Sequence, residues 1–141
     1  GSGHMYDLVS NTVHAATADL TADGHTFEIV GLLYLQGESD RGKETALAGS
    51  RLKELTDNLR VDLPNASNMP TVAAGTTARD AASMVNQEAI AHSTNYIDFF
   101  PNLDLKDQLA PDNLHLAKAA KIIVGKRFTE AFLNADIVDR R

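Results

Sequence analysis

Asp112 and His115 are the residues whose types and spacing most directly indicate chemistry. The sequence Asp112-Asn113-Leu114-His115 puts a carboxylate three residues before a histidine, just ahead of an apolar helical pattern. In a tight loop, this spacing lets the carboxylate reach Nδ1 of the imidazole and fix its tautomer, so that Nε2 can act as a general base. A plainer interpretation is that Asp112 or Asn113 caps the last helix and that His115 is exposed in its first turn.

A second polar segment, Gln36-Gly37-Glu38-Ser39-Asp40, directly follows a strongly apolar run. The Gln36 amide can donate a hydrogen bond to a developing oxyanion, whereas an ionised Glu38 cannot. Gly37 would let the backbone turn closely past a ligand. We expect Glu38 to hold loop amides or to contact substrate hydroxyls. The alternative is a loop that only caps the following helix, with Asp40 as a surface charge.

Helices and strands in strict alternation are expected to position these residues. Apolar spacing predicts helices over residues 6–20, 44–61, 78–92 and 116–131, and short apolar runs predict strands over 27–35, 70–76 and 95–100. This order is typical of a three-layer α/β/α fold with a parallel sheet and right-handed crossovers. Sites in such sheets form beyond the carboxyl ends of the strands, where Gln36 and His115 fall.

The same periodicity predicts which side chains face the core. For the helices these are Val9, Val13, Ala16 and Leu20; Leu52, Leu55 and Leu59; Ala82, Val85, Ala89 and, as a further candidate, His92; and Leu116, Ala120, Val124, Phe128 and Ala131. The run 27–35 is almost continuously apolar, which is typical of a strand covered on both faces.

Composition limits the classes of protein and partner. The 141 residues carry 13 Lys and Arg against 19 Asp and Glu, a net charge of −6 that disfavours nucleic acid as a partner. The longest apolar stretch, 29–35, is too short to cross a bilayer, so we expect a soluble protein without a membrane partner. Residues 1–5 are interpreted as an expression-tag remnant and residues 6–141 as one domain.

Metal and redox chemistry find little support in the sequence. The chain has no cysteine, which excludes disulfides and thiolate metal sites. Asp98, Asp104 and Asp107 make an acidic stretch, but it lacks the alternating Asp/Asn pattern and closing Glu of a calcium loop. We therefore expect neither a metal nor another cofactor.

The two polar motifs together resemble a known superfamily. Leu33-Tyr34-Leu35-Gln36-Gly37-Glu38-Ser39-Asp40, followed later by Asp112-Asn113-Leu114-His115-Leu116, resembles the SGNH (GDSL-like) hydrolases, and within them the branch of sialate O-acetylesterases and acetylxylan esterases. The resemblance implies a flavodoxin-like sheet of order 2-1-3-4-5, of which this chain would hold the last three strands. It also implies serine-type removal of acetyl groups from a sugar. His115 would be the base, Asp112 its orienting partner, and Gln36, Gly37 and Glu38 the oxyanion and substrate region.

The resemblance leaves the nucleophile unassigned. The family's serine lies in an early Gly-x-Ser-Asn motif, ahead of the Gln-Gly-Glu loop. Here Ser67 follows that loop and leads into a strand, and Ser39 lies inside it, so both are weak candidates. We therefore interpret residues 6–141 as the C-terminal part of such an esterase, inactive alone because the nucleophile block is absent.

Partners follow from the same interpretation. Without the family's first strand, the edge of strand 27–35 would be exposed, so we expect two copies to associate there or an N-terminal segment to complement it. The substrate of the parent enzyme would be an acetylated carbohydrate. The compartment stays open, with a secreted or periplasmic location among the options. The rival interpretation is a non-catalytic, self-associating or partner-binding α/β module derived from an esterase.

Overall fold

The computed structural model describes residues 3–37, 43–76, 81–113 and 115–134. Across these ranges, four α-helices and three β-strands alternate along the chain, with a short 3-10 helix before the last α-helix. In order, they are α1 (His4–Ala22), β1 (Leu32–Leu35), α2 (Lys43–Asp62), β2 (Thr71–Ala74), α3 (Ala81–Ser93), β3 (Ile97–Phe100), η1 (Leu103–Leu105) and α4 (Lys118–Asn134). The first turn of α1 thus includes two of the residues expected to be a tag remnant.

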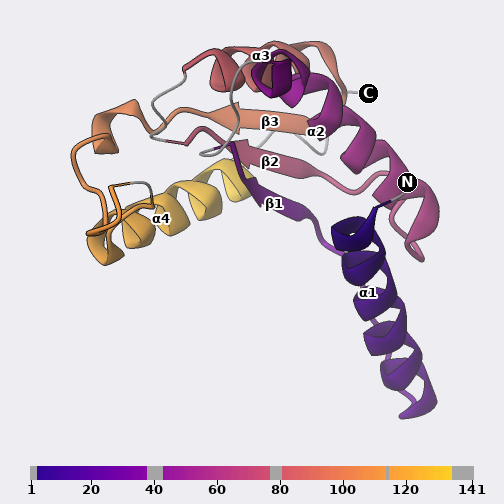
Figure 1. Cartoon of the computed structure of the whole chain (residues 1–141). Helices are drawn as coiled ribbons and strands as arrows, with labels where there is room; N and C mark the ends of the chain where they lie inside the picture. The colour runs from indigo at the N-terminus through magenta and orange to yellow at the C-terminus, as the bar shows by residue number, and fades with distance from the viewer. Residues whose placement is uncertain (1–2, 38–42, 77–80, 114, 135–141) are drawn as a thin grey trace.

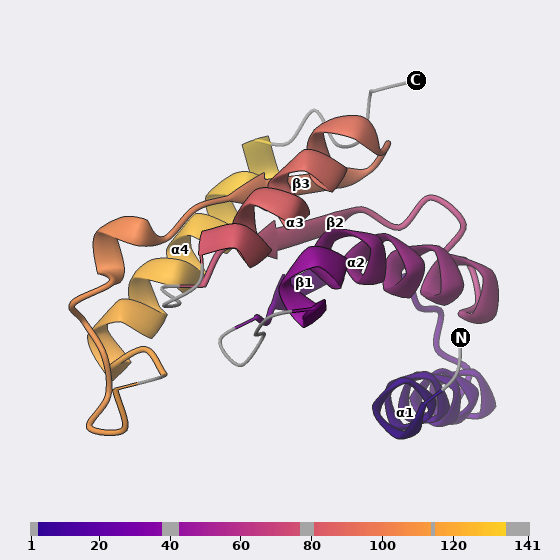
Figure 2. The same cartoon turned by 45° about the horizontal axis from the view of Figure 1, so that its top comes forward.

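The strands form one parallel sheet in the spatial order β1-β2-β3. The register pairs Leu33 with Val72 and Val72 with Asp98. Helices α2 and α3 cover one face of this sheet and α4 covers the other (Figures 1 and 2). The predicted α/β class with a parallel sheet between helical layers is therefore confirmed, and the strand order is consistent with the last three strands of a flavodoxin-like sheet.

Strand β2 is the centre of the core, and all four of its residues are buried. Val72 and Ala74 pack on the α4 side, while Ala73 packs on the opposite side with Leu52 of α2 and Ala91 of α3. Successive side chains of a strand point to opposite faces, so β2 contributes to both layers. The small alanines let the helices approach the sheet closely.

The prediction for strand 27–35 is wrong in extent and in burial. The paired strand covers only Leu32–Leu35, and its side chains alternate between half-buried and exposed. Leu33 is 55% exposed and Val30, just before the strand, is 60% exposed. The reason is that α4 packs on β2 and β3, so the β1 end of that face lacks a covering helix in the described structure.

Helix α1 forms as expected, but its predicted buried face is wrong at every position except Val13, which is half-buried. Val9, Ala16 and Leu20 are exposed, and Ser10 is the residue of this helix that is buried. The helix contacts α2 and then projects from the body of the molecule (Figure 1). Its docking is marked by the Tyr6 hydroxyl, which donates a hydrogen bond to the Asp62 carboxylate at the end of α2.

The predicted inward face of helix 78–92 is also wrong. Its four members Ala82, Val85, Ala89 and His92 are exposed. The side chains of α3 that are buried are Ser83, Met84, Gln87 and Ala91. Alanine spacing is a weak signal of orientation. Two polar residues of α3 face inward, because α3 packs closely on α2 and because Gln87 finds an acceptor in the Gln36 carbonyl after β1.

The other two helices match their predicted faces. In α2, Leu52 and Leu59 are buried and Leu55 is half-buried. In the C-terminal segment Leu116, Ala120, Val124 and Phe128 are buried and Ala131 is half-buried, although the helix starts at Lys118, after Leu116. Within the described ranges, no helix has both the length and the apolar character needed to span a membrane.

Candidate functional site

The Asp-x-x-His segment lies at the tip of a small hairpin between β3 and α4. Leu109 and Leu116 form an isolated antiparallel bridge at its base. Above the bridge, the Ala110 N–H donates to the His115 carbonyl at 2.7 Å, and the Asn113 N–H donates to the Ala110 carbonyl at 2.9 Å. Asn113 adopts a left-handed conformation with φ 55°, which an Asn tolerates better than most residues.

Within this tip, the Asp112 carboxylate makes both contacts that its spacing permits. Oδ2 lies 2.6 Å from His115 Nδ1, and Oδ1 accepts the His115 backbone N–H at 3.0 Å. The His115 side chain is 59% exposed and the Asp112 side chain is 50% exposed. Because α4 begins only at Lys118, neither Asp112 nor Asn113 caps that helix.

The hairpin is anchored through Asn102, which directly follows Pro101 after β3. This side chain is fully buried, and its Nδ2 donates to the Gly75 carbonyl beyond β2 at 2.7 Å. Arg127 of α4 donates to Asn102 Oδ1 at 2.8 Å and to both oxygens of Asp104 at 2.9 and 2.6 Å. The hydrogen bonds from Arg127 lower the pKa of Asp104. One network therefore joins β2, the hairpin entry and α4.

Gln36 and Gly37 follow the carboxyl end of β1. The Tyr34 hydroxyl donates to Gln36 Oε1 at 2.8 Å, and Gln87 of α3 donates from Nε2 to the Gln36 carbonyl at 3.2 Å. Gly37 is buried and has φ 136°, a conformation that favours glycine. The turn after β1 thus has a fixed backbone path, held from the α3 layer.

Comparison with known proteins identifies the family of this chain. The family model described as carbohydrate esterase, sialic acid-specific acetylesterase matches residues 1–134. The chain belongs to this acetylesterase family. No functionally curated protein matches it significantly.

A solved structure shares the fold of this acetylesterase-family chain. A protein from Arabidopsis thaliana, known from an X-ray structure, superposes with a TM-score of 0.74 at 24% sequence identity. The match covers 94% of this chain and 53% of the Arabidopsis protein, so the chain spans about half the length of that protein.

The predicted site residues of this chain divide between the two edges of the sheet. Gln36, Gly37 and the Asp112–His115 hairpin all follow the carboxyl ends of strands. Ser67 is exposed and precedes β2, which places it at the amino edge instead. Glu38 and Ser39 lie outside the described residues.

Two members of the acidic stretch, Asp98 within β3 and Asp104 after it, are engaged in structural contacts. Asp104 pairs with Arg127, and Asp98 Oδ1 accepts the backbone N–H of Phe99 at 2.8 Å. Among the residues that the structure describes, no group of three or more His, Asp or Glu side chains is placed to hold a metal ion.

Sequence reasoning missed Asn102 and Gln87, the two buried side chains that support the site. Asn102 has a signal that could have found it, since it is a polar residue at the carboxyl end of a strand, as Gln36 is. Gln87 has no such signal. It lies on a helix face that the apolar pattern assigned to solvent, and only the position of the Gln36 carbonyl explains its burial.

Proposed function

We propose that this chain carries the Asp112–His115 pair and the oxyanion loop of an enzyme that removes acetyl groups from carbohydrates by serine-type ester hydrolysis. The observation that supports this most strongly is the 2.6 Å contact between Asp112 Oδ2 and His115 Nδ1. A carboxylate on Nδ1 holds the proton there and leaves Nε2 to accept a proton. Membership of the acetylesterase family supports an acetylated sugar as the substrate class.

In the proposed reaction, His115 takes the proton of a serine hydroxyl as that oxygen bonds to the acetyl carbonyl carbon. The carbonyl oxygen becomes an oxyanion, to which the Gln36 amide donates a hydrogen bond. The bond to the sugar oxygen breaks, and His115 returns the proton to that oxygen. Water then attacks the acetyl-enzyme in the same way, which releases acetate and restores the serine. Gly37 and Glu38 shape the loop and contact the sugar.

The serine is proposed to come from a segment outside this chain. Ser67 lies at the amino edge of the sheet, whereas Gln36 and His115 follow carboxyl ends. Ser39 follows the proposed oxyanion donor Gln36 by three residues in the sequence, so it would have to serve in the same segment as that donor. Loss of one member of a catalytic triad costs several orders of magnitude in rate, so the chain alone is expected to be inactive.

The test is hydrolysis of 4-nitrophenyl acetate and of an acetylated xylo-oligosaccharide. We expect no enzymatic rate from the chain alone, and a rate from a longer product of the same reading frame that His115→Ala abolishes. A His115-dependent rate from the chain alone would show that its own serine acts, and Ser67→Ala and Ser39→Ala would then identify it. An active His115→Ala variant of the longer protein would overturn the assignment of the base.

A second candidate function, a self-associating module, is favoured by the exposed apolar surface along β1. Val30, Leu33 and Leu35 are exposed there, at 60%, 55% and 38%. Within the described sheet, β1 pairs on one side only, since it is the first strand of the order β1-β2-β3. Exposed apolar strand edges promote association.

A second copy of the chain is the proposed occupant of this surface, because charges on the two flanking helices complement one another. Helix α1 carries Asp7 and Asp19 and no Lys or Arg, whereas α4 carries three lysines, Lys118, Lys121 and Lys126, against one acidic residue, Glu130; its Arg127 pairs with Asp104. We expect concentration-dependent dimers in sedimentation velocity, abolished by Leu33→Asp. Val61→Asp, at a residue 83% exposed on α2, is the matched control and should leave the dimer intact. A strictly monomeric chain at all concentrations would refute this candidate.

A further inference from the structure

The amino edge of the sheet, opposite the hairpin, holds a cavity of about 470 Å³. It is lined by residues that precede each of the three strands, among them Glu28 before β1, Asn65 and Asn68 before β2 and Tyr96 before β3. Phe132, from the last turns of α4, closes one side. Cavities of roughly 300–1,000 Å³ are the size that binds small organic ligands.

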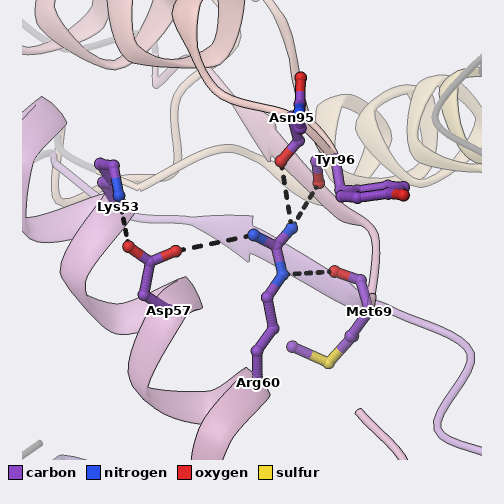
Figure 3. A network of polar contacts seen from close by, with 6 residues as sticks. All are labelled: Lys53, Asp57, Arg60, Met69, Asn95 and Tyr96. Carbon is purple, nitrogen blue, oxygen red and sulfur yellow. Dashed lines mark hydrogen bonds and ion pairs between the residues drawn. The ribbon is translucent and has the colours of Figure 1, made fainter. Parts of the chain in front are cut away.

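Arg60 of α2 fixes the two loops that line this cavity (Figure 3). Its Nε donates to the Met69 carbonyl at 3.0 Å, and its Nη2 donates to the Tyr96 carbonyl at 3.0 Å. The guanidinium also lies 5.6 Å from the centroid of the Tyr96 ring. The Arg60 side chain is only 11% exposed, and burial lowers its pKa. The loops before β2 and β3 are therefore tied to one buried cation.

Two lining residues have left-handed backbones that are rare outside glycine. Asn65 has φ 60° and Tyr96 has φ 63°. For a bulky side chain such as Tyr96 this conformation is an outlier, and such outliers concentrate at binding and active sites. The Tyr96 carbonyl accepts hydrogen bonds from the Thr71 N–H at 2.8 Å and from Arg60, which hold the strained residue in place.

The Phe132 ring, which forms one wall of the cavity, packs closely against the backbone of Gly31. A Cβ added to Gly31 would lie 2.4 Å from the Phe132 ring. Any larger residue at Gly31 would push this ring away, so the glycine permits an aromatic side chain at the cavity.

The lining combines ring faces with short polar side chains. Tyr96 and Phe132 offer aromatic surface, and Asn65, Ser67 and Asn68 offer amides and a hydroxyl that both donate and accept hydrogen bonds. Glu28 is the single charged side chain among the described lining residues, and it is an acceptor. Such a lining suits a neutral ligand that has apolar C–H faces and many hydroxyls, and it disfavours anions.

We propose that this cavity is a second carbohydrate-binding site, separate from the hairpin and selective for a neutral mono- or disaccharide. The sugar stacks on Tyr96 and exchanges hydrogen bonds with Asn65, Asn68 and Glu28. Arg60 acts through the loops that it holds. Binding at this site needs no ester chemistry, so this proposal can be tested independently of the proposed catalytic function.

The test is an NMR titration of the ¹⁵N-labelled chain with xylobiose, which is neutral and carries no acetyl ester. We expect saturable amide shift changes at residues 28–30, 65–69 and 96, unaltered by His115→Ala. N-acetylneuraminic acid, an anion, should bind more weakly because Glu28 repels it and no lining cation attracts it.

Two variants test the contacts. Asn65→Gly removes the amide and keeps the left-handed backbone without strain, and it should weaken xylobiose binding about fivefold. Tyr96→Ala should weaken it about tenfold or more. Glu54→Ala, which removes an exposed carboxylate of α2 outside the cavity, is the control and should leave the affinity unchanged.

Three results would overturn the proposal. The first is the absence of shift changes around the cavity at the highest sugar concentration. The second is shift changes confined to Gln36, Gly37 and the hairpin, which would place the sugar at the other edge. The third is unchanged affinity in the folded Asn65→Gly variant.

Discussion

Gln87 Nε2 donates a hydrogen bond to the Gln36 carbonyl at 3.2 Å, which ties the buried face of α3 to the turn after β1. Gln87 is 1% exposed, and its Oε1 has no hydrogen-bond partner among the described residues. The side chain therefore gives one hydrogen bond to the turn after β1 and leaves one buried oxygen unpaired. Its contribution is to the position of Gln36 more than to net stability.

This balance predicts a clear difference between two substitutions of Gln87. Gln87→Leu removes the bond and the unpaired oxygen together, so the free energy of unfolding should change by no more than about 1 kcal/mol. Gln87→Glu places a buried carboxylate against a carbonyl oxygen and should cost about 3 kcal/mol at pH 7, less when protonated in acid. Urea denaturation at two pH values measures both. Equal losses for the two variants would contradict this account.

Asp112 is predicted to set the tautomer of His115. With Oδ2 2.6 Å from Nδ1, the neutral imidazole should carry its proton on Nδ1. Asp112→Ala should shift the population toward the Nε2–H tautomer, since that form prevails in a free histidine side chain. The ¹⁵N shifts of the His115 ring report the two forms directly, and His14, exposed on α1, serves as the internal control. An unchanged His115 spectrum would show that the carboxylate does not orient the ring.

The Asp104–Arg127 pair should make the hairpin anchor sensitive to acid. Hydrogen bonds from Arg127 lower the folded-state pKa of Asp104 below its ordinary value of 3.8. A depressed carboxyl pKa contributes stability that is complete above pH 3.8 and is lost as the pH falls through the lower folded value. NMR titration of the Asp104 carboxyl carbon checks the direction, and Asp104→Asn should remove the dependence. A midpoint at or above 3.8 would contradict it.

Tyr6 should make the docking of α1 sensitive to base. Partial burial and the hydrogen bond to Asp62 raise the pKa of Tyr6 from 10.0 to about 12. A raised phenol pKa contributes stability that is complete below pH 10 and is lost as the pH rises toward 12. Ultraviolet titration should show one late-ionising tyrosine among the three, absent in Tyr6→Phe. Three coincident titrations would argue against the contact.

Gly49 of α2 and Gly125 of α4 are two helix glycines with different surroundings, so substitutions at the two positions can be compared. A Cβ on Gly49 would lie 2.2 Å from the Asn86 carbonyl oxygen, so Gly49→Ala should push α2 and α3 apart and cost about 1–3 kcal/mol. Gly125 of α4 has open space around a Cβ, so Gly125→Ala should stabilise by about 0.5–1 kcal/mol through helix propensity. Thermal unfolding compares the two, and the same sign for both would refute this packing.

Much of the fold could be predicted because the relevant signals are local. The run from Val72 to Ala74 is buried on both sides and reads as a strand, and the leucines of α2 repeat at helical spacing. The Asp112–His115 contact is equally local, since three residues and a tight turn bring carboxylate and imidazole together. These features need only backbone sterics and side-chain periodicity.

Burial could not be predicted where it depends on what lies opposite. The apolar residues Val9 and Leu33 read as core from sequence, yet both are exposed because neither faces a packed element in the described structure. Gln87 and Asn102 read as surface, yet both are buried because each finds a backbone carbonyl from a distant part of the chain.

The sequence by itself determined the alternation of helices and strands, the acetylesterase motifs and the pairing of Asp112 with His115. Only the tertiary structure decided that Ser67 stands at the opposite edge from Gln36, and that Arg60 joins the loops before β2 and β3. The physical reason is the separation along the chain of the residues that make each contact. Spacing along a chain fixes contacts within a turn, whereas contacts between segments depend on the register and packing of the whole sheet.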